Sequence, residues 1–122
     1  MPLDRVDLSK YRSDVFIETG THRGDGVRRA LEAGFESVMT CELDPSWLMR
    51  MPREFITHER VRIGVGRSSR ILTDYCMMAG GESVTFWLDA HPDGKLVFET
   101  SPLFEELETI KGWRNLSQIS PY

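Results

Sequence analysis

The 122-residue chain is 40% hydrophobic and 28% charged, with a formal net charge of −4, so it has the length and composition of one small globular domain rather than of a disordered or fibrous protein. It has no apolar run of membrane-spanning length, and its first residues lack the basic-then-apolar layout of a signal peptide. We therefore expect a cytoplasmic protein, not associated with membranes, whose Cys41 and Cys76 are reduced thiols rather than a disulfide.

The first predicted strand, at 15–19, runs into a glycine-bearing turn and then into an amphipathic helix predicted over 25–34. The sequence there is Val15-Phe-Ile-Glu-Thr-Gly-Thr-His-Arg-Gly-Asp-Gly26. A strand, a tight loop and a helix N-terminus together form a cradle for a ligand. The spacing after Gly20 does not fit the dinucleotide motif G-x-G-x-x-G, and Leu96 after the Gly94-Lys95 pair excludes a phosphate-binding P-loop.

Strands and helices are predicted to alternate along the rest of the chain. We expect further strands near 37–42, 61–66 and 84–90, and further helices near 45–55, 69–79 and 102–112. This alternation predicts a parallel sheet with right-handed crossovers. Asp44, Ser68 and Ser101 are predicted to cap helix starts, and Gly34 and Gly80 to end helices.

The pattern Glu18-x-Gly20-x-x-x-Gly24 resembles the first motif of class I S-adenosylmethionine (SAM) methyltransferases. Glu42 closes the second strand, 42 − 18 = 24 residues later, where such folds keep a carboxylate for the ribose. The segment 66–72 resembles the family's Gly-Asp-Ser-Ser segment beside the adenine, except that Arg67 stands where an acid is usual. The Leu-Asp-Ala-His segment at 88–91 matches one branch of the family, and the resemblance covers roughly residues 15–111.

The resemblance implies a single α/β domain over 1–122, with a Rossmann-like parallel sheet in the order 3-2-1-4. It also implies helices on both faces and the absence of the family's usual last strands. The fourth strand would then lie at an edge of the sheet. Because its residues alternate in a way suited to burial on both faces, we expect a homodimer or higher assembly that covers this edge.

The implied cofactor is SAM, and the implied cofactor-binding residues lie at strand ends and in the loops that follow them. Glycines in the first loop would let the backbone approach the methionine part, Thr21 would bond its carboxylate, and Glu42 would accept from the ribose hydroxyls. The alternative is an ordinary strand-to-helix turn and a solvated strand end. The full set of cofactor-binding residues is Glu18, Thr19, Gly20, Thr21, Gly24, Glu42, Ser68 and Asp89.

Asp89 and His91 are the candidate catalytic pair, because their i, i+2 spacing at the end of the fourth strand points both to one side. His91 would take the proton of a hydroxyl acceptor, and Asp89 would bind the SAM amino group. In the alternative, Asp89 caps the turn that follows and His91 is exposed. No metal is expected, because the downstream acidic pair of related sugar methyltransferases has no counterpart here.

These features favour an O-methyltransferase acting on a small hydroxylated molecule. Two alternatives stay open. One is a SAM-binding domain or partner subunit without transferase activity, and the weaker one is an RNA-directed methyltransferase. The arginines between 50 and 70 are interpreted as a solvated surface, so nucleic acid is not an expected partner.

Overall fold

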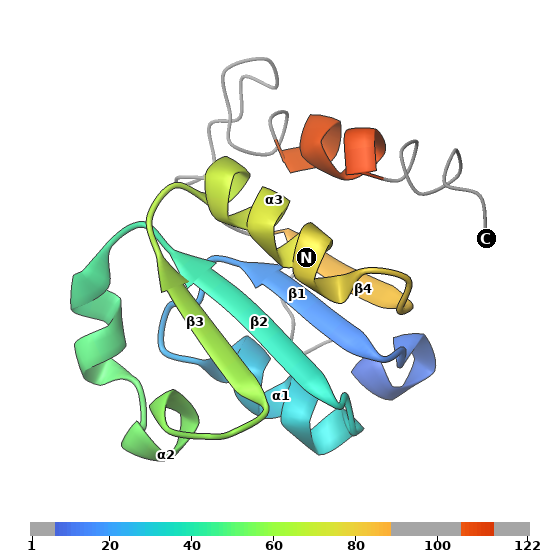
Figure 1. The fold of residues 1–122 in the computed structure, drawn as a ribbon. Helices are drawn as coiled ribbons and strands as arrows, with labels where there is room; N and C mark the ends of the chain where they lie inside the picture. Colours follow the sequence, from blue (N-terminus) through green and yellow to red (C-terminus); the bar gives the residue numbers. More distant parts are fainter. Residues whose placement is uncertain (1–6, 89–105, 114–122) are drawn as a thin grey trace.

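The computed structural model describes residues 7–88 and 106–113. Within these ranges the chain forms a four-stranded parallel sheet of β1 (Val15–Thr19), β2 (Ser37–Glu42), β3 (Val61–Val65) and β4 (Val84–Leu88) (Figure 1). The strand order is β3-β2-β1-β4, which confirms the predicted order 3-2-1-4. Every residue of β1 is buried, as expected of a central strand in a parallel sheet covered on both faces.

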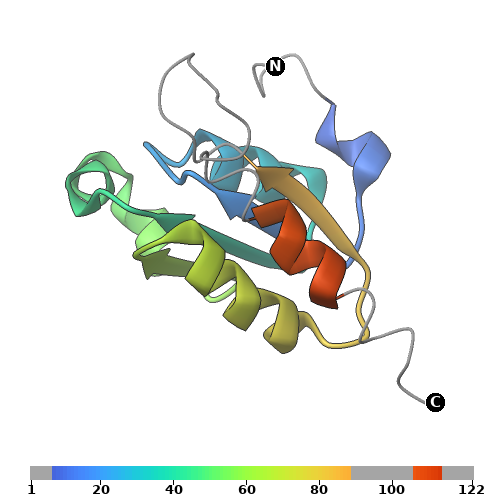
Figure 2. The same ribbon diagram turned by 90° about the horizontal axis from the view of Figure 1, so that it is seen from above.

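Helices cover both faces of the sheet, as predicted (Figure 2). On one face α1 (Asp25–Ala33) packs through Val27 and Ala30 against Phe16 and Val38. On the other face lie α3 (Ser68–Ala79) and a helix over 106–113. Two hydrophobic clusters thus form, one on each side of the sheet.

The single helix predicted near 45–55 is wrong. The chain instead forms a 3-10 helix, η3 (Pro45–Arg50), and a short helix, α2 (Arg53–Ile56). The break falls at Met51 and Pro52. Proline has no amide hydrogen and disfavours helical geometry at the residue before it, and Met51 is extended, with ψ of 139°.

The predicted helix ends are confirmed in part. The Asp44 side chain accepts a hydrogen bond from the Ser46 amide, 3.0 Å away, and caps η3. Gly34 ends α1 with φ of 93°, and Gly80 ends α3. The predicted Ser68 cap is wrong, since α3 begins at Ser68 itself and its N-cap residue makes no side-chain capping bond. The predicted cap at Ser101 lies outside the described residues.

The segment before β1 is hydrogen-bonded to the edge strand β4. A short 3-10 helix, η2 (Leu8–Tyr11), leads into this segment. The Thr85 hydroxyl donates to the Tyr11 carbonyl at 2.6 Å and lies 2.9 Å from the Ser13 hydroxyl. On the opposite face of β4, the Phe86 ring meets the Trp113 ring edge-on at 6.1 Å. The edge strand is therefore half-buried along its length.

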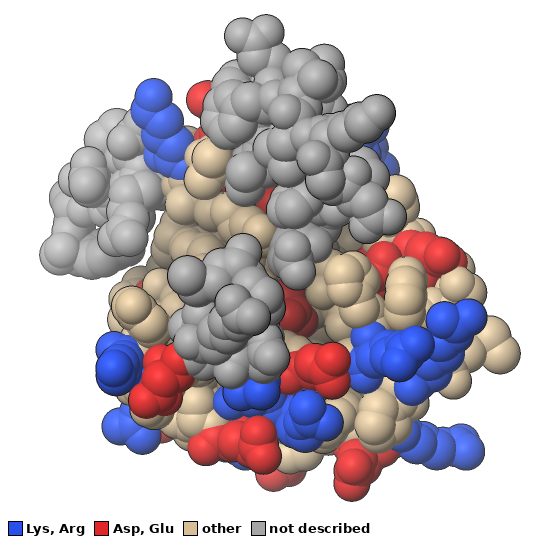
Figure 3. Space-filling model, turned by 180° about the vertical axis from the view of Figure 1, so that it is seen from behind, with Lys and Arg blue, Asp and Glu red and all other residues tan. Residues whose placement is uncertain are grey.

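Cys41 and Cys76 are both buried free thiols, which confirms their predicted state. No helix in the described part of the chain combines the length and the apolar character that crossing a bilayer requires. On the side that carries α1, basic and acidic side chains alternate across the described surface (Figure 3). Such mixing is typical of a solvated face.

Candidate functional site

The carboxyl ends of β1 and β2 bring together several residues that are far apart in the sequence. Glu18 pairs in register with Thr40, and Thr19 pairs with Cys41. Parallel strands end at the same edge of a sheet, so the loop after β1 lies beside the end of β2. The predicted residues from Glu18 to Gly24 and Glu42 therefore share one edge of the sheet.

The first loop depends on two glycines in the left-handed region. Gly20 has φ of 89° and Gly24 has φ of 90°. The Gly24 amide donates to the Thr21 carbonyl at 2.9 Å and closes the turn. A Cβ at Gly24 would also lie 2.9 Å from the end of the Met51 side chain. Gly24 is thus required both by the backbone conformation and by the space around it.

Thr21 is directed into the protein rather than toward solvent. Its side chain is 1% exposed, and its hydroxyl lies 2.7 Å from the Thr40 hydroxyl. The amides of Gly20 and Thr21 both donate to the Cys41 carbonyl, at 2.8 and 3.1 Å. These bonds hold the loop against β2, so the buried Thr21 stabilises the conformation of the loop. Its contact with a cofactor carboxylate stays a prediction.

Glu18 is a buried carboxylate that fits beneath the start of α1. It is 3% exposed, and its Oε1 accepts from the Thr40 hydroxyl at 2.8 Å. Its other oxygen lies against Gly26, where an added Cβ would be only 1.8 Å away. Gly26 was not among the predicted site residues, although the third glycine of the Gly20–Gly26 run was visible in the sequence.

Glu42 is held in place by two backbone amides. Its Oε1 accepts from the His22 amide at 3.0 Å, and its Oε2 accepts from the Asp44 amide at 3.1 Å. The residue is 7% exposed. Each carboxylate oxygen has room for a second hydrogen bond, so this fixed carboxylate has the capacity to accept from two neighbouring hydroxyls.

Next to Glu42 lie His22, the following residue Leu43 and the β3 register partner Val65, and the sequence predicted a role for none of them. His22 has φ of 48°, and its Nε2 lies 3.9 Å from Glu42 Oε1. Its ring also packs 5.3 Å from the Trp47 ring. Leu43 is 72% exposed and Val65 is 52% exposed, at the ends of β2 and β3. The place of Leu43, an apolar residue directly after the acidic strand end at Glu42, was the sequence feature that could have indicated a role for it.

The Cys41 thiol lies near several acidic residues. Burial, together with the negative charges of Glu106, Glu18 and Glu42, raises the pKa of Cys41 to about 12. Glu106 is the first described residue of the helix over 106–113 and is itself buried. The carboxylates of Glu18 and Glu42 at the ends of β1 and β2 make this edge of the sheet acidic. Nothing in the sequence distinguished Glu106 from the exposed Glu108 of the same helix.

The remaining predicted residues lie at other strand ends or outside the described ranges. Ser68 is a buried residue at the start of α3. Two residues before Ser68, the Gly66 amide donates to the Glu42 carbonyl at 2.9 Å. This bond holds the start of α3 beside the end of β2. Asp89 and His91 lie outside the described residues. The last described residue of β4, Leu88, pairs with Thr19.

No family model matches the chain, and no curated protein matches it. Among solved structures, it is similar to the SAH-bound methyltransferase PaMTH1 of Podospora anserina. The two share 17% sequence identity with a TM-score of 0.65, over 88% of this chain and 43% of that one. This chain thus spans less than half the length of that neighbour. The strand order, the helices on both faces and this similarity together show that the chain has a Rossmann-like fold, which it shares with that methyltransferase.

Proposed function

We propose that the chain binds SAM at the carboxyl edge of β1 and β2 and transfers its methyl group to an oxygen of a small hydroxylated molecule. The observation that carries this proposal is the pair of carboxylates, Glu18 and Glu42, that the ends of β1 and β2 place at one edge of the sheet beside the loop of Gly20 and Gly24. SAM carries a positive sulfonium and an ammonium beside one carboxylate, so its net charge is positive. An acidic edge attracts such a molecule, and it attracts the neutral-sulfur product less strongly.

The local geometry supports one orientation of the cofactor. The loop from Gly20 to Gly24 takes the methionine part, where the two glycines let the backbone approach closely. The Glu42 carboxylate accepts from the ribose hydroxyls, because two amides already fix its position. Exposed Leu43 and Val65 offer an apolar surface beside this carboxylate for the purine.

The chemistry is an in-line displacement. Bound SAM would supply the methyl group for displacement by the acceptor oxygen, and the electron pair of the broken carbon–sulfur bond would return to sulfur. The acceptor proton passes to a base, a role we assign to His91, with Asp89 holding the SAM ammonium. Asp89 is the residue after Leu88, and His91 follows two residues later, so the register of Leu88 with Thr19 supports placing them beside the first loop.

Binding and turnover are tested separately. Calorimetry with SAM and with its demethylated product SAH measures binding, and mass spectrometry of mixed hydroxylated acceptors detects methylation. Glu42→Gln removes the carboxylate, and we expect SAH affinity to fall about 10- to 100-fold, as for the loss of a hydrogen bond to a charged group. Glu36→Gln is the matched control, because Glu36 is an exposed acid just before the amino end of the same strand.

The outcomes distinguish the functions that remain open. SAH binding with no methylated product would favour the alternative of a SAM-binding domain without transferase activity. Replacement of the usual acid by Arg67 supports that alternative. Absence of binding to both SAM and SAH in the folded protein, or equal losses in the Glu42 and Glu36 variants, would refute the proposed site.

A further inference from the structure

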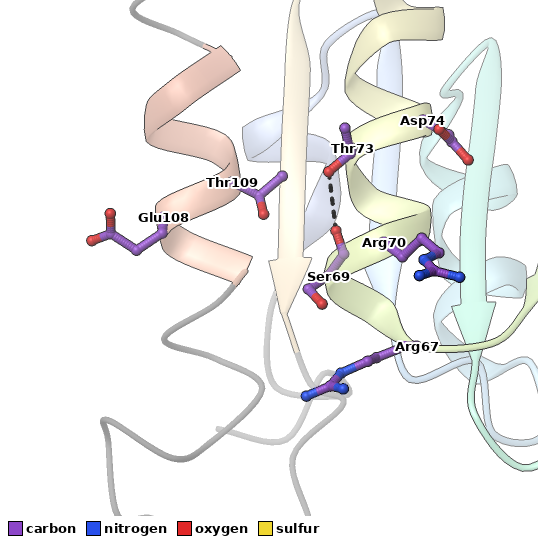
Figure 4. Close-up of a pocket in the computed structure, with 7 residues that line it drawn as sticks. All are labelled: Arg67, Ser69, Arg70, Thr73, Asp74, Glu108 and Thr109. Carbon is purple, nitrogen blue, oxygen red and sulfur yellow. Dashed lines mark hydrogen bonds between the residues drawn. The ribbon is translucent and has the colours of Figure 1, made fainter.

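A pocket lies at the amino ends of β2 and β3, at the edge of the sheet opposite to the proposed SAM site. Its volume is about 410 Å³, within the range of small-molecule sites. Met78 of α3 lines it on the side of β3, whereas the hollow drawn in Figure 4 lies on the other side of α3, toward the helix over 106–113. β2 extends from Ser37 in the pocket to Glu42, so about 17 Å of strand separates the two sites.

Two glutamates give this pocket an acidic end. In the register of the sheet Val38 pairs with Val61, and the Val38 amide donates to the Arg60 carbonyl at 2.8 Å. Two steps back along both chains, this register places Glu36 beside Glu59, and both residues line the pocket. Neighbouring parallel strands are about 4.8 Å apart, so the two acids act together on a cation bound at this end.

Two arginines, Arg60 and Arg62, line the adjoining part of the pocket and are called the arginine pair. Arg62 is the register partner of Met39 on β2. The Arg60 Nη1 atom donates to the Phe35 carbonyl at 3.1 Å, which holds this guanidinium beside the start of β2. A guanidinium has several N–H donors, so Arg60 retains others for a ligand. Guanidinium groups bind carboxylates through paired hydrogen bonds, so the arginine pair is suited to a carboxylate.

The acidic end and the arginine pair do not neutralise each other. In the part of the chain that the structure describes, no ion pair joins Glu36 or Glu59 to either arginine. Successive residues of a strand are about 3.3 Å apart, so the acidic end and the arginine pair lie within reach of one small molecule. A free α-amino acid carries an ammonium and a carboxylate on a single carbon atom, so it presents both charges at a spacing of this order.

Two methionines, Met39 and Met78, line the pocket beside these charges and are called the methionine wall. Met39 is 7% exposed and Met78 is 48% exposed. Methionine side chains are flexible and polarizable, so they adapt to aliphatic groups of different shape. An aliphatic side chain buried against them adds hydrophobic stabilisation to the ionic contacts.

From the acidic end, the arginine pair and the methionine wall, we propose that this pocket binds a free α-amino acid with an aliphatic side chain. The ammonium lies at the acidic end, and the carboxylate accepts hydrogen bonds from the arginine pair. The aliphatic side chain packs on the methionine wall. This site is separate from the SAM site, and the proposal does not depend on SAM binding.

The probe is L-leucine, titrated into the ¹⁵N-labelled chain at about pH 6.5, where α-amino groups are protonated, and followed by amide NMR. We expect saturable shifts at the amides of Ser37, Arg60, Arg62 and Met78, with a dissociation constant of about 1 mM. Three analogues each lack one feature of the probe: 4-methylpentanoate has no ammonium, L-leucine methyl ester has no carboxylate, and glycine has no side chain. We expect each analogue to bind at least about 5-fold more weakly than leucine.

Variants test the ionic contacts. Glu59→Gln and Arg62→Gln should each weaken leucine binding about 10-fold, as expected when one charge-assisted contact is lost. Glu54→Gln and Arg53→Gln are the matched controls, because both residues are exposed on α2 and lie outside the pocket. The same spectra report whether each variant is folded.

Three results would overturn this inference. They are the absence of saturable shifts at the pocket amides, equal affinity for leucine and any of its three analogues, and equal losses in the variants and their matched controls. Leucine shifts confined to His22 and Leu43 would place the ligand at the carboxyl edge and would also refute the pocket. A parallel titration with SAH, followed at those two amides, tests the proposed function independently. Binding of SAH without binding of leucine refutes the pocket alone, and the reverse result refutes the SAM site alone.

Discussion

Gly26 shows how one absent side chain shapes the candidate site. The Glu18 carboxylate occupies the space that a Cβ at residue 26 would take, 1.8 Å from Glu18 Oε2. Glu18 in turn accepts from Thr40, which lies beside the hydroxyl of Thr21. The first loop is therefore held by buried hydrogen bonds among Glu18, Thr40 and Thr21. These bonds form only because residue 26 has no side chain to displace Glu18.

Gly26→Ala should therefore displace Glu18 and destabilise the protein by about 1–3 kcal/mol, the range for overpacking a buried site. Urea unfolding followed by circular dichroism measures the loss. Gly81→Ala is the matched control, since a Cβ there meets nothing within 4 Å. Shortening the carboxylate with Glu18→Ala should reduce the effect of Gly26→Ala, because the clash is then absent. Additive effects of the two changes would contradict this account.

His91 is the residue on which the proposed chemistry depends most. His91→Ala should lower methyl transfer about 10²- to 10⁴-fold, the usual contribution of a general base, while SAH affinity stays unchanged. Single-turnover assays with an identified acceptor measure the first effect, and calorimetry measures the second. A variant that retains full activity would assign the base to another group.

At the scale of elements, α3 begins without a side-chain cap and with Arg67 at its N-cap position. Arg67→Asp places a capping acceptor there and should stabilise the protein by about 0.5–2 kcal/mol. The aspartate would also restore an acceptor for the adenine amino group, which a guanidinium cannot provide. We therefore expect tighter SAH binding by calorimetry. Higher stability with unchanged or weaker affinity would show that the family's acid has no counterpart at this position.

The elements differ in how far the sequence predicted them. Glu18, Gly20, Gly24 and Glu42 were recognisable because strand ends and turn glycines follow local rules. The contact of Gly26 with Glu18 was not recognisable, because it depends on how α1 packs over the end of β1. The interaction of Glu106 with Cys41 was not recognisable, because the two residues are 106 − 41 = 65 positions apart in the sequence. The pattern near 45–55 was helical, and Pro52 was the local signal that should have divided it.

Because β4 lies at an edge of the sheet, we predict a homodimer or higher assembly that covers this edge. Sedimentation equilibrium should show an average mass that rises above 14.0 kDa with concentration. Thr85→Lys should weaken this assembly, since a charge on an edge strand blocks edge pairing. The Thr85 hydroxyl also bonds to Tyr11 within the chain, so circular dichroism must confirm that the variant is folded. A parent chain that stays monomeric at high concentration would rule the assembly out.

For the whole molecule, buried acids predict a loss of stability at alkaline pH. Burial raises the pKa of Cys41 from 9.0 to about 12 and that of Cys76 from 9.0 to about 11, and it also raises the pKa of Tyr75. Above about pH 9 the unfolded thiols lose protons that the folded thiols retain. The folded state then loses stability as pH rises from about 9 toward 11–12, by up to about 1.4 kcal/mol per pH unit for each group.

Urea unfolding between pH 7 and pH 10.5 measures this decline. Cys41→Ala should make the decline shallower, because one group with a raised pKa is removed. Tyr11→Phe is a control, since the Tyr11 side chain is exposed. An equal slope in the parent chain and in Cys41→Ala would show that Cys41 does not contribute to the alkaline loss.

The place of β1 between β2 and β4 also has a consequence for the order in which the protein folds as it is synthesised. Val15 pairs with Ser37 on one side and with Val84 on the other, and the second partner is 84 − 15 = 69 residues away. A nascent chain on the ribosome can therefore assemble β1, β2 and β3 before β4 exists. During that interval the most buried strand of the finished sheet has one open edge. Pairing of β4 with β1 is then a late step between residues far apart in the sequence. We expect chaperones to bind the open edge of β1 before this step.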